Sequence, residues 1–400
     1  MATNDAPDII SDQSKLADER LTRFYNAYRK IIRTDSTEYQ ADLLVFIEMF
    51  VSDCIATNEA GYTFKHPAPP RIAYIAKRLG VAYFDQLNRY LDIYTPKYVY
   101  SPKIELFFRA CKDLGLIEQH RFIAPMAMNR YGERDAETFN RLIEQIRKSG
   151  RTPKYKARIA KDSYRSTKRF INLVRYVDAL FEHVRSQLLV VRVDLSYRKE
   201  EIETMKLGEA QEDLKHFLDN MKGKPKLFGD LVGYIWKLER SSTGGDHFHL
   251  LFFFTNDHIS SDERYGREIG EYWIDTITKG RGKYYNCNTQ YEKSKHRWPA
   301  IGSVKYYEDQ KRYSLLYVLA YFCKDEQSLR IKTKQKTRAF GRGVMPSPRE
   351  NVGGRPRSIE IDHGSYLRLI DCNLNKAMRR PPKPAQLIKQ TLPLSWIQGF

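Results

Sequence analysis

The sequence predicts an α+β fold, in which a central antiparallel sheet with packed helices is preceded by a mostly helical N-terminal domain. Three observations lead to this prediction. Apolar residues recur at helical spacing through residues 1–145, strand-like apolar runs begin near residue 187, and two of these runs flank a short Ser- and Gly-rich turn. With 400 residues, of which 42% are hydrophobic, the chain can form several cores and is too apolar to be largely disordered.

The first 145 residues are expected to form a helical accessory domain. Its predicted helices are separated by turn-like stretches such as HPAPP at 66–70. They cover residues 16–34, 38–57, 72–79, 83–93, 102–114 and 135–148. No catalytic constellation stands out in this part of the sequence.

A second domain is expected over residues 173–345. Its first strand is the run LLVVRVDLSY at 188–197, and two further strands flank the turn SSTGG at 241–245, which predicts an antiparallel hairpin. The hairpin strands cover 232–240 and 247–254, a short strand is expected at 302–306, and helices are expected at 200–221, 269–276 and 312–325. Residues 346–400 form a basic, Pro-, Gly- and Arg-rich tail with room for one helix at 365–377.

The positive charge is concentrated in two segments. The chain has 68 Lys and Arg against 49 Asp and Glu, a formal charge of +19. Residues 147–169 and 331–400 together carry this whole excess, and the first of them lies in a basic linker or helix at 146–172. Clustered cations interleaved with tyrosines attract a phosphate backbone. Nucleic acid is therefore favoured over a solvated surface or an anionic membrane face, with Lys154, Lys156 and Arg158 as candidate DNA-binding residues.

Neither a membrane span nor a disulfide framework is indicated. No apolar run approaches the roughly 18 residues that a span needs, and the polar, acidic start of the chain does not resemble a signal peptide. The five cysteines are far apart and form no Cys-x-x-Cys pair. We expect a cytoplasmic protein without a membrane partner.

His247 and His249 are the strongest candidates for metal ligands. Side chains alternate along a strand, so both imidazoles lie on one face. If the turn is centred near residue 244, Glu239 lies opposite His249 on that face, whereas Asp246 lies on the other. Two imidazoles and a carboxylate from adjacent strands can hold a divalent metal with open positions. The alternative is a solvated strand end with ordinary histidines.

One face of the helix predicted over 312–325 carries Tyr317, Tyr321 and Lys324. Residues three or four apart on a helix are neighbours. An ammonium group would stabilise a phenolate, and a phenolate leaves more readily than an alkoxide, which suits reversible transfer of a DNA strand. A packing role competes with this interpretation, because the chain has 27 tyrosines and Tyr313 continues the same stripe.

The order of these motifs resembles the HUH endonucleases, which are metal-dependent nucleases that nick single-stranded DNA through a covalent 5′-phosphotyrosine. The similarity is closer to the replication initiators of the filamentous-phage (inovirus gene II) and YagK/YfjJ type. It rests on four segments within roughly residues 170–345. These are RYVDALFEHVRSQLLVVRVDLSY at 175–197, YIWKLERSSTGGDHFHLLFFF at 234–254, AYFCK at 320–324 and RAFGRG at 338–343.

The resemblance implies an HUH/RRM-like palm and a rolling-circle replication initiator. It implies Mg²⁺ or Mn²⁺ on His247, His249 and Glu239, with Tyr321 as nucleophile beside Lys324. Tyr317 would be a second nucleophile, as in double-tyrosine phage initiators. The implied partners are single-stranded origin DNA and a host helicase and polymerase in a bacterial cytoplasm. Arg338 and Arg342 of the RAFGRG segment are implied DNA contacts. The sequence departs from the family with Ala320 in place of a usual serine and Cys323 in place of a usual alanine.

Three alternatives are consistent with parts of this pattern. A transposase or a conjugative relaxase would use the same chemistry for another task. A non-catalytic DNA-binding regulator would retain the fold and bind DNA without a covalent product. An iron oxygenase with two histidines and one carboxylate would need neither the charge of +19 nor a tyrosine helix.

Overall fold

The computed structural model divides into two compact units. Unit 1 comprises Met1–Asp35, Arg165–Lys324 and Gln335–Phe400, and unit 2 comprises Ser36–Tyr164 and Asp325–Lys334. The residues that the structure describes are 6–31, 39–68, 71–96, 98–117, 120–130, 132–206, 208–241, 245–255, 262–294, 300–323, 330–331, 338–348 and 365–372.

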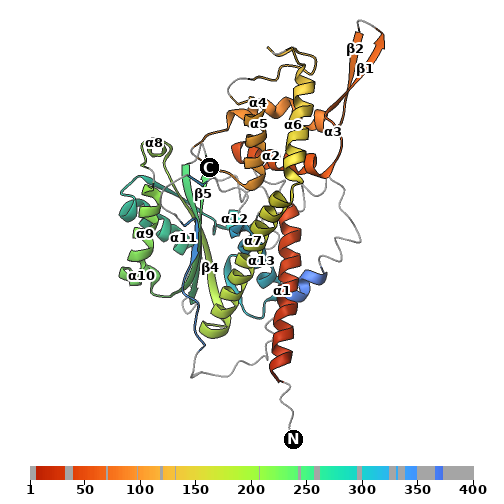
Figure 1. The fold of residues 1–400 in the computed structure, drawn as a ribbon. Helices are drawn as coiled ribbons and strands as arrows, with labels where there is room; N and C mark the ends of the chain where they lie inside the picture. Colours follow the sequence, from red (N-terminus) through yellow and green to blue (C-terminus); the bar gives the residue numbers. More distant parts are fainter. Residues whose placement is uncertain are drawn as a thin grey trace. The chain divides into compact units, whose positions relative to one another are not determined.

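Unit 1 contains an antiparallel sheet, so the predicted combination of helices with an antiparallel sheet is confirmed (Figure 1). The strand order is β10-β5-β6-β4-β7, and β8 pairs with the other end of β4. The strands are β4 (Gln187–Tyr197), β5 (Leu231–Ser241), β6 (Gly245–Thr255), β7 (Gly282–Asn286), β8 (Gly302–Lys305) and β10 (Phe340–Arg342).

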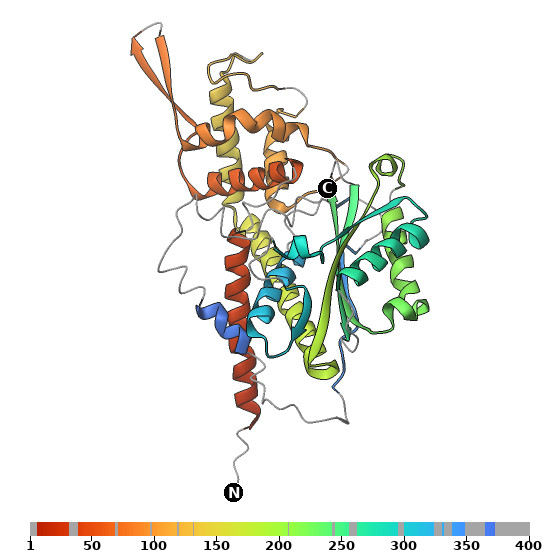
Figure 2. The ribbon, with the colours of Figure 1, turned by 180° about the vertical axis from the view of Figure 1, so that it is seen from behind.

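Helices cover both faces of this sheet (Figure 2). One face packs against α1 (Ala6–Ile31), α7 (Pro153–Ala179) and α13 (Asp309–Phe322). The other packs against α9 (Glu209–Asn220), α10 (Pro225–Phe228) and α11 (Asp262–Tyr272). Short helical segments complete the unit: α8 (Lys199–Ile202), α12 (Gln290–Ser294), Leu180–Val184, Met221–Gly223, Trp273–Ile277 and Ser365–Leu367.

The sheet face under α13 changes character along its strands. At one end it is apolar, with Val190 of β4 and Phe253 of β6 directly paired and fully buried. Further along the same face, β4 presents Arg192 and Asp194, and Asp194 pairs with His249 of β6. These polar side chains are also buried. The helices that form the apolar core therefore also enclose a polar cluster.

Unit 2 is mostly helical, with two small antiparallel pairs of strands. The hairpin of β1 (Tyr62–Ala68) and β2 (Arg71–Ala76) extends from the helices (Figure 1), and β3 (Tyr98–Val99) pairs with β9 (Arg330–Ile331). The helices are α2 (Tyr39–Ala56), α3 (Arg78–Tyr83), α4 (Leu87–Asp92), α5 (Pro102–Asp113), α6 (Asp135–Gly150) and a short turn at Phe84–Gln86. Their core includes Ile47, Phe50, Leu87, Phe107, Phe139 and Leu142.

Several expected elements differ from the observed ones. The helix predicted over 72–79 is wrong, because IAYI at 72–75 pairs in β2 and the helix starts only at Arg78. The helix predicted over 200–221 is interrupted, and Gly208 has a φ of +96° at the start of α9. Strand β7 was not predicted, since KYYN lies among polar residues. The basic segment is helical from Pro153 onward.

The unit boundaries also differ from the expected break at residue 145. The first helix belongs to unit 1, because its apolar side chains Leu21, Phe24 and Tyr25 are buried in the same cluster as α7 and α13. Such periodicity indicates a helix with one buried face but does not say which core that face joins. Of the expected tail at 346–400, only 346–348 and 365–372 lie among the described residues. Among all the residues that the structure describes, no helix has both the length and the apolarity of a membrane span.

Candidate metal and tyrosine site

The hairpin of β5 and β6 sets the positions of the candidate metal ligands. Glu239 pairs with His247, and Lys237 pairs with His249. The expected pairing of Glu239 with His249 is therefore wrong by two residues. A shift of two preserves the face, because side chains alternate with period two. Gly245 begins β6 with a φ of +64°, and a Cβ there would lie 2.8 Å from Ile202, so this turn requires glycine.

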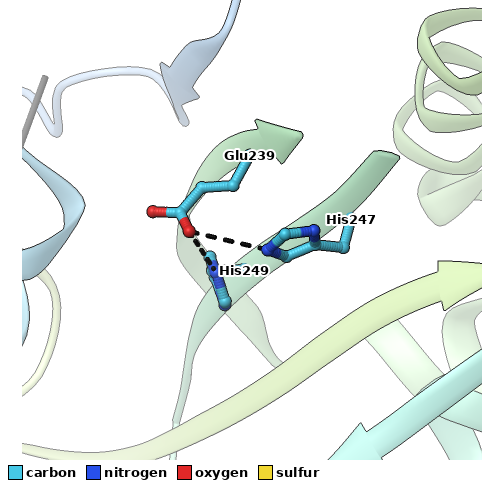
Figure 3. Close-up of side chains that lie close together, drawn as sticks. All are labelled: Glu239, His247 and His249. Atoms are coloured by element: carbon cyan, nitrogen blue, oxygen red, sulfur yellow. Dashed lines mark ion pairs between the residues drawn. The ribbon is translucent and has the colours of Figure 1, made fainter. Parts of the chain in front are cut away.

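Glu239, His247 and His249 converge on one point (Figure 3). Oε2 of Glu239 lies 3.5 Å from Nε2 of His247 and 3.3 Å from Nε2 of His249. One ligand atom from each residue lies within 4.8 Å of the others. The cluster is enclosed, since both histidines are buried and the Glu239 side chain is 14% exposed. This arrangement could hold a metal ion with two nitrogen donors and one oxygen donor.

Asp194 fixes the orientation of the His249 ring. Its Oδ1 lies 3.0 Å from Nδ1 of His249. Burial opposes ionisation of Asp194, but the charges of Arg192 and His249 outweigh it and hold the pKa of this carboxyl below its usual value. An ionised carboxylate only accepts hydrogen bonds, so Nδ1 carries the proton and Nε2 faces Glu239. A carboxylate behind a ligating imidazole is the usual support of a metal-binding histidine.

Two buried cations balance the carboxylates of the cluster. Arg192 donates from its Nη2 to Oδ2 of Asp194 at 3.0 Å and from its Nε to Oδ1 at 3.2 Å. Lys237 pairs with Oε1 of Glu239 and donates a hydrogen bond to the Tyr321 carbonyl at 3.3 Å. The side chain of Asn288 holds the Arg192 backbone at both its N–H and its carbonyl. Each buried carboxylate of the site is thus paired with a buried cation, which offsets the cost of burying its charge.

Tyr321 of α13 is the tyrosine that reaches this cluster. Its hydroxyl lies 3.1 Å from Nε2 of His249. The two cations lie near its ring, with Cζ of Arg192 at 5.3 Å and Nζ of Lys237 at 5.0 Å from the ring centroid. A phenol, two imidazoles, two carboxylates and two cations therefore meet over one sheet face.

The protonation of these groups follows from burial and their neighbours. Burial raises the pKa of Tyr321, the carboxylates of Glu239 and Asp194 raise it further, and Arg192 partly offsets them. Burial also opposes the charged form of Glu239, but Lys237 and His249 hold its pKa well below the usual value. In His249, Asp194 and Glu239 raise the pKa against the effect of burial. Glu239 is therefore an anion that faces a neutral phenol.

Tyr317 contacts other partners. Its hydroxyl lies 3.2 Å from that of Tyr313, and its ring packs edge-on against Phe24 and Tyr28 of α1, with centroids 5.0 and 5.8 Å away. Burial raises its pKa. The structure thus brings Tyr321, but not Tyr317, into contact with the candidate metal ligands. Lys324, the third expected residue of this helix, lies outside the described residues.

The RAFGRG segment forms the edge strand β10. Gly341 pairs with Trp236, and a Cβ on Gly341 would lie 2.4 Å from the indole nitrogen. The Arg342 guanidinium lies 4.6 Å from the centroid of the Tyr176 ring and donates to the carbonyl of Gly343. Arg338 is exposed. Gly341 and Arg342 of this motif therefore have packing roles, against Trp236 and Tyr176. Arg338 remains accessible to a partner.

The remaining candidate DNA contacts lie on the first turns of α7. Lys154, Lys156 and Arg158 are all exposed. Arg158 also forms an ion pair with Glu105 of α5, which lowers the pKa of that carboxyl. Lys154 and Lys156 leave their ammonium groups at the surface, where a phosphate can reach them.

The four motif segments and the whole polar cluster fall within one stretch of the chain. Residues 151–343 match the family model of the YagK/YfjJ C-terminal domain. This YagK/YfjJ segment runs from the start of α7 to the end of β10 and includes every residue of the cluster. No curated protein and no solved structure matches the chain. The YagK/YfjJ part of the resemblance is thereby supported. Of unit 2, residues 36–150 lie outside the match.

Sequence reasoning missed Lys237, Arg192 and Asp194. All three lie on the same sheet face as the candidate ligands. Lys237 is two residues from Glu239, Asp194 is opposite His249, and Arg192 is two residues before Asp194. A charged residue in an otherwise apolar strand was the available signal, because ions are rarely buried unless they are paired. LLVVRVDLSY contains two such residues at period two.

Proposed function

We propose that this protein nicks and rejoins single-stranded DNA at a replication origin, as a rolling-circle initiator with an HUH-type palm. The observation that carries the proposal is the contact of 3.1 Å between the Tyr321 hydroxyl and His249 Nε2, next to Glu239 and His247. A phenol beside a histidine–carboxylate cluster combines a nucleophile with a site for a divalent cation. The YagK/YfjJ match is consistent with this proposal.

His247, His249 and Glu239 would hold Mg²⁺ or Mn²⁺. The Glu239 carboxylate is a donor that suits either ion, and Mg²⁺ would retain several water ligands. When bound, the cation would make the phosphorus of a scissile phosphodiester more electrophilic. The side chains behind the donors keep them in place, since Asp194 holds His249 and Lys237 occupies the second oxygen of Glu239.

Tyr321 would supply the nucleophile. Its phenolic oxygen forms a bond to phosphorus, the bond from phosphorus to the 3′ oxygen breaks, and that oxygen leaves as a 3′-hydroxyl after taking up a proton. The phenol loses its own proton in the same reaction. Arg192 and Lys237, which lie over the Tyr321 ring, stabilise the negative charge that develops on the phenolic oxygen. Reversal of these bond changes rejoins the strand.

The products and the surface charge suggest the biological setting. The released 3′-hydroxyl is a primer end for a host polymerase, and a host helicase would open the duplex ahead of it. The exposed cations Lys154, Lys156 and Arg338 would bind the DNA backbone. Transposases and relaxases share this chemistry. The initiator role is therefore tested by which DNA the protein cleaves.

The first experiment tests the chemistry with the full chain. Single-stranded DNA libraries from phage and plasmid origins are incubated with Mn²⁺, and denaturing gels are used to detect a protein–DNA adduct whose linked peptide is then mapped. We expect an adduct on Tyr321 that EDTA abolishes. Tyr321→Phe should give no adduct, whereas Tyr317→Phe, one helical turn away, should retain it. Tyr317→Phe loses one hydrogen bond, which costs about 1 kcal/mol of stability.

Two outcomes would contradict the proposal in different ways. An adduct that maps to Tyr317 and survives Tyr321→Phe would refute the assignment of the nucleophile. Sequence-specific binding of an origin, with no adduct on that same origin in Mn²⁺, would instead favour a DNA-binding regulator that retains the fold.

A further inference from the structure

An aromatic cavity in unit 2 lies entirely outside the metal and tyrosine site. It has a volume of about 410 Å³, which falls within the range of small-molecule clefts. Its wall comes from the chain around β3 and from one side of α5. The lining residues are Tyr94, Thr95, Pro96, Tyr98, Val99, Tyr100, Glu105, Phe108, Arg109 and Lys112.

Four aromatic rings form most of this wall, and they are held in place. Tyr94 and Phe108 have ring centroids 5.0 Å apart, and Tyr100 lies 4.8 Å from Phe108. The Tyr100 hydroxyl accepts a hydrogen bond from the Thr95 N–H at 2.8 Å, which ties the loop to the ring. Burial raises the pKa of Tyr100 to about 12, so the phenol adds no negative charge. The aromatic wall is therefore neutral and preorganised.

Tyr98 provides a partly accessible ring of the cavity. It is half-buried and meets Tyr100 edge-on, with centroids 6.4 Å apart. Its neighbour Val99 is 41% exposed. The backbones of both residues are paired with β9, so β3 has a strand partner. A ring that is fixed at its backbone and open on its side can stack against a planar ligand at low entropic cost.

The rim of the cavity is positively charged. Lys112 places its ammonium 4.6 Å from the centroid of the Tyr94 ring. Arg109 pairs with Glu105 at 2.8 Å, and Arg158 of α7 pairs with the same carboxylate. Two of these cations share one acidic group, and the exposed Lys154 and Lys156 precede Arg158 on α7 by four and two residues. An anionic ligand with a flat apolar part fits this combination of charge and rings.

We propose that this cavity of unit 2 binds single-stranded nucleic acid by stacking an unpaired base on Tyr98. The cations of the rim, Lys112 and Arg109, contact the adjoining phosphates. Aromatic stacking with a basic surface is the usual way to hold single strands regardless of sequence. The inference does not require cleavage, and it gives unit 2 a task of its own, which is to hold the strand outside the metal and tyrosine site.

The test is equilibrium binding of the full chain in EDTA, so that it is independent of the nicking reaction. Fluorescence anisotropy is measured with a labelled oligothymidine and with an abasic oligomer of equal length and charge. Tyr98→Leu keeps an apolar side chain but removes the ring, and Tyr98→Phe keeps the ring. We expect Tyr98→Leu to weaken binding of the oligothymidine by about 5- to 100-fold, as loss of one stacked base does. Tyr98→Phe should bind as the unmodified chain does.

The abasic oligomer distinguishes stacking from general damage. Its binding should be equal for the unmodified chain and for Tyr98→Leu, because it offers no base to stack. Lys112→Gln should lower the dependence of binding on salt for both oligomers, by about one unit in the logarithmic slope. The proposal is overturned if Tyr98→Leu leaves oligothymidine binding unchanged, or if it weakens binding of both oligomers to the same extent.

Discussion

Asp194 lies behind His249, with its Oδ1 3.0 Å from Nδ1 of the imidazole. The two residues are directly opposite each other on neighbouring strands, so the sheet itself sets their distance. The contact assigns the proton to Nδ1 and turns Nε2 toward Glu239 and Tyr321.

Asp194→Asn should therefore weaken metal binding without removing a ligand. We expect the affinity for Mn²⁺ to fall by about 10- to 100-fold, as it does when the partner behind a ligating histidine is lost. Isothermal titration calorimetry on the full chain measures this change. Asp246→Asn is the matched control, because Asp246 precedes His247 but faces away from the cluster. Equal affinities in both variants would show that Asp194 does not support the site.

Metal binding by Glu239, His247 and His249 should also stabilise the fold. At a Mn²⁺ concentration about 100-fold above the dissociation constant, the free energy of unfolding should rise by about 2.7 kcal/mol. His247→Ala should abolish this gain, whereas His216→Ala, an exposed histidine on α9, should retain it. Urea titrations with and without Mn²⁺ provide the measurement. A gain that survives in His247→Ala would place the metal elsewhere.

Arg192 should be important for stability as well as for chemistry. Its side chain is 1% exposed and paired with Asp194, so Arg192→Met leaves a buried carboxylate with less compensation. Removing one partner of a buried ion pair costs about 3–5 kcal/mol. In Arg264→Met, which breaks an exposed pair with Glu268 on α11, the cost should stay near 0.5 kcal/mol or below. Urea denaturation compares the two, and similar small losses would contradict the buried pairing.

The first helix should contribute to the stability of unit 1. Phe24 is 3% exposed and contacts the rings of Phe170 and Tyr313. Phe24→Ala should cost about 3–5 kcal/mol, as removal of a buried aromatic side chain does. Leu16 lies on the same helix but is 45% exposed, so Leu16→Ala should have a small effect. Thermal unfolding of the full chain measures both, and equal shifts would contradict the assignment of α1 to this core.

The sequence predicted the parts of the site that depend on local alternation. His247, His249 and Glu239 share a face because the strands were recognised, and an error of two residues in the register left that face unchanged. The tyrosine helix followed from its spacing, but its orientation did not. Whether Tyr317 or Tyr321 faces the sheet depends on how α1 packs, since Phe24 and Tyr28 contact Tyr317.

Pairing between strands and between buried charges explains what the sequence did not reveal. The strand at 71–76 looked helical until its partner β1 was known. Composition alone would place charged side chains at the surface. Two ion pairs, Lys237 with Glu239 and Arg192 with Asp194, allow these charges to be buried. A match to a family model identifies the segment 151–343, but it does not assign these pairs.

The division of the chain between the units has a consequence for synthesis on the ribosome. Helix α1 is made before unit 2, yet its partners Phe170 and Tyr313 are made only after nearly all of unit 2. Its apolar face therefore stays exposed, or is bound by a chaperone, during the synthesis of residues 36–164. Unit 2 in turn lacks β9 until α13 has been completed. Neither unit can finish folding before the other is largely made, so partial chains should be the species most at risk of aggregation.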